Sequence, residues 1–165
     1  MDESASAAHR RNRQWLSTAT AALVVAGLVW AAPVGVDHRA LFAEQTALRE
    51  VLPAFQKAEQ ALQADAKAEQ EGRLSQQQLV EALEQRHMPA YRAVGDALAR
   101  VPADVRSDRL DDLRGLQSGV LELMALEVGQ ARGTVDAVQA QARSAQVAQT
   151  LRAISERMKA RNTGG

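Results

Sequence analysis

The side chains with the clearest metal-binding spacing in this sequence are Glu84 and His87. A glutamate followed three residues later by a histidine is the spacing with which dimetal centres in helical bundles hold their ions. Such a centre needs a second pair and further glutamates, and neither His9 nor His38 has a glutamate three residues before it. A homodimer could supply the second pair, but an incidental histidine on a helix surface is the simpler interpretation. We therefore predict no cofactor, with Glu84 and His87 as weak candidate metal ligands.

Other patterns that carry chemistry are missing from the sequence. The chain has no cysteine, which excludes disulfides, thiolate metal sites, thiol catalysis and covalent haem attachment. It contains no phosphate-binding Gly-Lys-Ser/Thr loop, no Gly-x-Ser-x-Gly elbow and no His-Glu-x-x-His helix. Its 20 basic and 20 acidic residues cancel, and no basic stripe stands out in the part after residue 37. We expect neither an enzyme nor a nucleic-acid partner.

Two glycine pairs, Gly115–Gly119 and Gly129–Gly133, share the small-x-x-x-small spacing that lets membrane helices approach closely. Charged neighbours such as Glu122 exclude burial of this segment in lipid. The glycines therefore either allow close docking of another helix or weaken their own helix, by about 1 kcal/mol each relative to alanine. We favour the second interpretation for Gly115 and Gly119, and a turn at Gly133.

The strongest signal concerns location. Residues 14–36 carry no charge and would span roughly 33 Å as a helix, close to the hydrocarbon thickness of a bilayer. The residues that would anchor this segment, with the indoles near its two ends, are Trp15, Leu23, Val24, Val25, Leu28 and Trp30. Positive charge stays on the cytoplasmic side of a membrane, and the segment is preceded by Arg10, Arg11 and Arg13. We predict a cytoplasmic basic tail over 1–13, a transmembrane signal-anchor over 14–36 and an extracytoplasmic domain over 37–161.

A cleaved signal peptide is the competing interpretation of the same segment. Val29-Trp30-Ala31 places small residues where a signal peptidase cuts, which would give a mature start at Ala32. The uncharged run is longer than the apolar core of about 7–15 residues in most signal peptides, so we favour the retained anchor. Arginine far outnumbers lysine and alanine is abundant, as in GC-rich bacterial genes. The expected location is a bacterial inner membrane with the bulk of the chain in the periplasm. Cleavage near Ala31 would instead secrete the mature protein into the periplasm.

The elements after the anchor all read as helices, because Ala, Leu, Gln, Glu and Arg dominate and no alternating β-branched run occurs. We predict a first helix that begins after its N-cap, Asp37, and ends at Gly72, with Pro53 causing a kink near residues 49–53. Further helices are predicted over 75–101, 104–131 and 134–160, with Ser75, Asp104 and Thr134 as N-caps. Their apolar stripes are Leu41, Leu48, Val51, Phe55, Ala58 and Leu62; Leu79, Val80, Leu83, Tyr91, Val94, Leu98 and Val101; and Leu110, Leu113, Leu116, Val120, Leu123, Met124 and Val128. A second proline, Pro89, falls inside the second helix.

These helices predict an all-α fold: a single N-terminal transmembrane helix followed by an antiparallel bundle of four helices. The alternative is three helices, the last running from 105 to 160 for about 80 Å and overshooting its partners. In the last segment Val135, Val138 and Ala142 lie nearly opposite a second stripe formed by Val147, Leu151, Ile154 and Met158. That segment either buries two faces or is an imperfectly patterned terminal helix, and we favour the latter. Residues 162–165 should be a flexible end.

The function that these features favour is a non-catalytic interaction or scaffold module of the cell envelope. Its expected partners are the lipid bilayer and either another envelope protein or a second copy of the chain. An alternative is a small-ligand sensor that resembles the periplasmic four-helix domains of chemoreceptors. Such sensors need a second membrane crossing and a cytoplasmic output, so this chain would serve as an accessory subunit. A metal-binding bundle is the third hypothesis.

Overall fold

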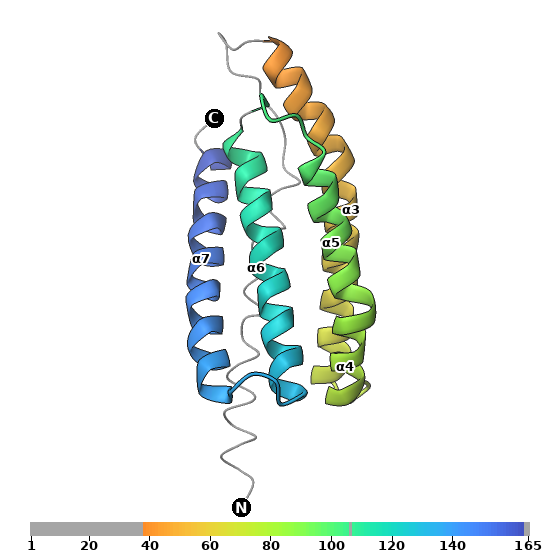
Figure 1. Ribbon diagram of the computed structural model, residues 1–165. Helices are drawn as coiled ribbons and strands as arrows, with labels where there is room; N and C mark the ends of the chain where they lie inside the picture. The colour runs from red at the N-terminus through yellow and green to blue at the C-terminus, as the bar shows by residue number, and fades with distance from the viewer. Residues whose placement is uncertain (1–37, 106, 164–165) are drawn as a thin grey trace, which may run out of the picture.

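Four helical rods lie side by side in the computed structural model, which describes residues 38–105 and 107–163 (Figure 1). The first rod is α3 (His38–Gln70), and the second is continuous through α4 (Gln76–Ala82), the π-helix η1 (Leu83–His87) and α5 (Met88–Ala99). The third and fourth are α6 (Asp108–Ala131) and α7 (Ala137–Thr163). Successive rods run in opposite directions, so the predicted all-α bundle is confirmed for these residues, as is the break near Gly133 that makes it four-membered.

No helix among the described residues combines the length and the apolar character needed to cross a bilayer. The predicted anchor over 14–36, from Trp15 to Trp30, lies outside the described residues, and so do Arg10, Arg11 and Arg13. The bundle itself begins at His38. At its other end α7 continues to Thr163, two residues past the predicted limit of the domain.

The helix ends at Gly72 and Gly133 follow from glycine's tolerance of positive φ. Their φ angles are 72° and 70°, a left-handed conformation that ends many helices and is strained for other residues. After α3, the Gly72 N–H donates to Glu69 O at 2.9 Å and the Arg73 N–H to Ala68 O at 2.8 Å. The same pattern of bonds closes α6 around Gly133. The predicted turn roles of both glycines are therefore confirmed.

The predicted cap Asp37 lies outside the described residues; of the other three helix starts, Ser75 agrees with the prediction, and those of α6 and α7 differ. Ser75 accepts from the Gln78 N–H, and the Gln78 side chain accepts from the Ser75 N–H, which together form a capping box. α6 is capped by Ser107 rather than Asp104, because the chain first makes a turn in which Val105 N–H donates to Pro102 O.

The start of α7 also lies later than predicted. Asp136 caps this helix, accepting from the Val138 and Gln139 N–H groups at 2.9 and 3.1 Å. The predicted cap, Thr134, instead donates its hydroxyl to Gly129 O and completes the end of α6. Thr134 therefore belongs to the end of α6, and Asp136 begins α7.

Pro53 lies inside α3, whereas Pro89 changes the helix type before it. A proline has no N–H and its ring crowds the carbonyl four residues back. Here the turn over Leu83–His87 widens into a π-helix, and the Met88 N–H bonds to Leu83 O five residues back. The wide turn gives the Pro89 ring room without breaking the rod.

The core lies between the rods and contains most members of the predicted stripes, with Val101 and Val128 partly buried at its edge. Phe55 and Tyr91 are fully buried and meet edge to face, with ring centroids 5.6 Å apart. α7 contributes one stripe, made of Ala140, Val147, Leu151, Ile154 and Met158. The opposite stripe is not a buried face of the bundle, because Val138 is 75% exposed and Ala142 is exposed too.

Candidate functional site

Glu84 and His87 both belong to η1, but the structure does not bring their side chains together. The Glu84 carboxylate pairs with Arg132 of α6 at 2.9 Å on the exposed surface. His87 is buried, and its Nε2 lies 2.8 Å from Asp65 Oδ2 of α3. Residues three apart share a face of an α-helix, and the wider π turn removes that alignment. Over 38–105 and 107–163, no three histidine or carboxylate side chains are grouped so that they could hold a metal ion.

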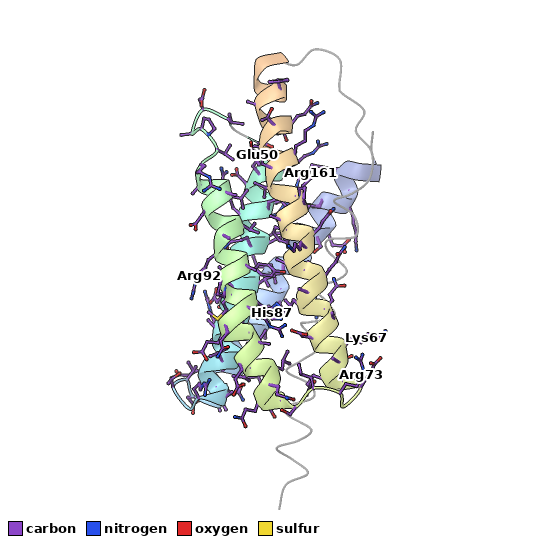
Figure 2. All side chains as sticks on the ribbon, turned by 90° about the vertical axis from the view of Figure 1, so that its right-hand side faces the viewer. Glu50, Lys67, Arg73, His87, Arg92 and Arg161 are labelled. Carbon is purple, nitrogen blue, oxygen red and sulfur yellow. The ribbon has the colours of Figure 1, made fainter. Side chains whose placement is uncertain are left out.

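The Asp65 carboxylate joins α3 to the π turn. Its Oδ2 accepts from Arg86 Nη2 at 2.7 Å as well as facing His87 at 2.8 Å. Figure 2 shows His87 in the space between the two rods. A histidine oriented by an aspartate is the acid–base part of a hydrolase triad, but His87 is only 3% exposed. A substrate has no access to a ring buried to this extent, so the contact serves to join the helices.

A second buried polar contact lies further along the same pair of rods. The Tyr91 hydroxyl donates to the Glu59 carboxylate, and Gln63 Nε2 donates to its other oxygen at 2.9 Å. Burial, with the negative charge of Glu59 adding to it, raises the pKa of Tyr91 far above its ordinary value. Gln117 of α6 donates to the backbone oxygen of Tyr91 at 2.8 Å. These bonds tie α3, α5 and α6 to one another and give both carboxylate oxygens a donor.

The interface between α6 and α7 is built on Gly115 and Gly119. A Cβ on Gly115 would lie 2.7 Å from Ile154 Cδ1, and one on Gly119 would lie 2.7 Å from Leu151 Cδ2. Real Cβ atoms do not approach so closely, so the two α7 side chains occupy the space that the glycines leave. The prediction that these glycines only weaken their helix is wrong for Gly119, which allows close helix docking because Leu151 Cγ would also lie 3.2 Å from its Cβ. At Gly115 the close atom is a terminal methyl, and the next atom is 3.8 Å away.

Charged side chains complete the same interface at the start of α6 and the end of α7. Asp112 is 5% exposed and accepts from Arg157 at 3.0 Å, and it also pairs with Arg161. Arg161 reaches Asp108 at 3.5 Å as well. Acidic groups at a helix start and basic groups at a helix end each complement the helix dipole, so one set of ion pairs stabilises both ends.

A shallow groove of about 200 Å³ lies on the outer side of this interface. It is lined by Gly115 and Gly119 and by polar side chains that include Glu122, Arg143 and Gln146. Pockets that bind small molecules usually enclose about 300–1,000 Å³. The groove is smaller, and two of its lining residues, Arg143 and Glu122, pair with each other, so it gives the sensor hypothesis no support.

The sequence prediction missed the buried contacts of Glu59, Asp65 and Tyr91. One signal was available, because Glu59 follows Phe55 by four residues and precedes Leu62 by three, and therefore falls in the apolar stripe. A carboxylate in such a stripe needs a buried partner. The partner depends on the register between two helices, and one sequence does not reveal it.

The described residues thus hold polar groups that pair with one another between helices, and no group of three metal-ligating side chains occurs among them. Comparisons with models of protein families, with curated proteins and with solved structures found no match to this chain.

Proposed function

We propose that this chain is a single-pass protein of a bacterial inner membrane, with its N-terminus in the cytoplasm and its helical bundle in the periplasm. In this proposal the bundle is a non-catalytic interaction or scaffold module. The observation that carries the proposal is the uncharged run over 14–36, flanked by the basic residues up to Arg13 and followed almost at once by the bundle at His38.

The bundle has features that suit a tethered domain in an oxidising compartment. It lacks cysteine and depends on packing, including the Phe55–Tyr91 contact and the α7 side chains seated on Gly115 and Gly119. Among its described residues the large hydrophobics classed as exposed are Phe42 and Val138. A surface this polar is stable in water, and we expect partner proteins to contact it through polar side chains.

The membrane part of the proposal is tested by fractionating cells that express the full chain and washing the membranes with alkaline carbonate. The chain should stay in the washed membranes. Arginines at two central positions, L23R with L28R, should move it to the soluble fraction, because each costs about 2.5–3.5 kcal/mol in the middle of a membrane helix. The control is A142R with A145R, two arginines at exposed positions of α7. Wild-type chain in the carbonate supernatant would contradict the anchor.

The interaction part is tested by photo-cross-linking in intact cells. A photoreactive residue is placed in turn at exposed positions on different rods, such as Arg92 of α5 and Gln149 of α7, and at the buried Leu123 as the control. We expect discrete cross-linked products from one exposed face and none from position 123. The absence of any product from every exposed position would contradict an interaction module.

A further inference from the structure

Among the described residues, two large hydrophobic side chains are mostly exposed, and they lie near opposite ends of the bundle. Phe42 is 70% exposed near the start of α3, and Val138 is 75% exposed at the start of α7. In Figure 1, α3 begins at the upper end and α7 begins at the lower end. Single exposed hydrophobics are common on protein surfaces, so the position of each along the bundle decides whether it has a role.

The first turns of α3 project beyond the other rods (Figure 1). Glu44 accepts a hydrogen bond from the hydroxyl of Ser107, the N-cap of α6. The six residues of α3 before Glu44 therefore add about 9 Å of helix beyond that contact. Phe42 lies on this projection, and Thr46 and Arg49 continue the same exposed face at helical spacing.

The projecting end is also the end nearest to the predicted anchor. Phe42 follows Val36 by six positions, so the two lie at most about 20 Å apart even if the chain between them is fully extended. The headgroup layer adds about 5–7 Å on each side of the hydrocarbon. Phenylalanine is among the residues that interfacial segments insert into the boundary between headgroups and acyl chains. The ring is therefore within reach of the outer headgroup layer, whereas Val138 is separated from it by the length of the bundle.

We infer that Phe42 seats the projecting end of α3 in the headgroup layer of the bilayer that the anchor enters. This inference rests on the proposed function. It orients the bundle with its α3 start toward the membrane and its α6–α7 turn, at Gly133, toward the periplasm. The exposed Arg49, on the same face two turns further on, is available for the phosphates of the lipid headgroups.

The test uses the full chain in vesicles of phosphatidylcholine and phosphatidylglycerol whose acyl chains carry bromine. Trp15 and Trp30 are replaced by phenylalanine, and a single indole is introduced by F42W. The matched control is V138W in the same background, an equally exposed position at the far end. We expect the indole at position 42 to emit at shorter wavelength and to lose emission to brominated lipid, and the indole at 138 to do neither.

Two results would contradict the inference in different ways. In the first, the chain floats with the vesicles, but the indoles at 42 and 138 show the same emission wavelength and neither is quenched by brominated lipid. That result supports the anchor and shows that the seating of Phe42 is wrong. If the chain does not float with the vesicles, the proposed anchor fails and the inference fails with it. Circular dichroism of both variants verifies that the bundle remains folded.

Discussion

The substitution G119A distinguishes the two interpretations of the glycines in α6. If Gly119 merely weakens its helix, alanine should stabilise the protein by about 1 kcal/mol. In the structure, however, the new methyl would lie 2.7 Å from Leu151 Cδ2, 3.2 Å from Leu151 Cγ and 3.5 Å from Val147 Cγ1. Because Cγ is the branch point of the leucine, rotating its terminal methyls does not clear the contact.

Overpacking of this kind costs about 1–3 kcal/mol. Set against the gain of about 1 kcal/mol in helix propensity, G119A should lower the free energy of unfolding by about 0–2 kcal/mol. G115A should be nearly neutral, because the close atom there is Ile154 Cδ1, a terminal methyl, and the next atom is 3.8 Å away. The free energy of unfolding is measured by chemical denaturation of the purified full-length chain in mild detergent, followed by circular dichroism.

A double-mutant cycle with L151A makes this prediction sharper. Without the Leu151 side chain the clash is absent, so G119A should then stabilise by about 1 kcal/mol, a coupling of about 1–3 kcal/mol between the two positions. A125G, at an exposed position in the same helix, measures how much a glycine in α6 lowers the free energy of unfolding when no side chain packs on it. If G119A stabilises the protein by the same amount with and without Leu151, the docking role assigned to Gly119 is wrong.

Two further predictions concern the buried polar contacts. Tyr91 is the only tyrosine in the chain, and burial raises its pKa above the ordinary value of about 10, so folding favours the neutral phenol. The stabilisation from this shift is complete below pH 10 and is lost as the pH rises above it. Phenolate absorbance near 295 nm should therefore appear only at the pH at which circular dichroism shows that the protein unfolds. If Tyr91 titrates near pH 10 while the protein is still folded, the burial of its hydroxyl is wrong. E84A should lower the free energy of unfolding by at most about 1 kcal/mol, because the pair between Glu84 and Arg132 is exposed. H87A should lower it by about 1–3 kcal/mol, because the hydrogen bond between His87 and Asp65 is lost. Equal effects in the same denaturation measurements would indicate that the two residues act as one site.

The core of this bundle was predictable because its stripes depend only on local periodicity. Leu48 to Leu62 in α3 and Leu110 to Met124 in α6 recur at helical spacing and are buried as expected. Gly72 and Gly133 were predictable for a similar reason, since a helix-ending glycine needs no information from distant residues.

Features that depend on contacts between helices were not predictable. Glycine at 115 and 119 looks destabilising until Ile154 and Leu151 are known to lie on it. The same holds for His87, whose partner Asp65 is 22 residues away, and whose distance from Glu84 in space depends on the π turn before Pro89. The cap of α7 was predicted at Thr134, but the Thr134 hydroxyl closes α6 and Asp136 caps α7 instead.

The central claim, a bundle tethered outside the cytoplasm, is tested most directly by a pair of reporters fused after Gly165. Alkaline phosphatase folds into active enzyme only in the periplasm, and green fluorescent protein exported by the general secretory route fluoresces only when it remains in the cytoplasm. We expect high phosphatase activity and no fluorescence from the membrane fraction. Fluorescence with no phosphatase activity would place the bundle on the cytoplasmic side and contradict the claim.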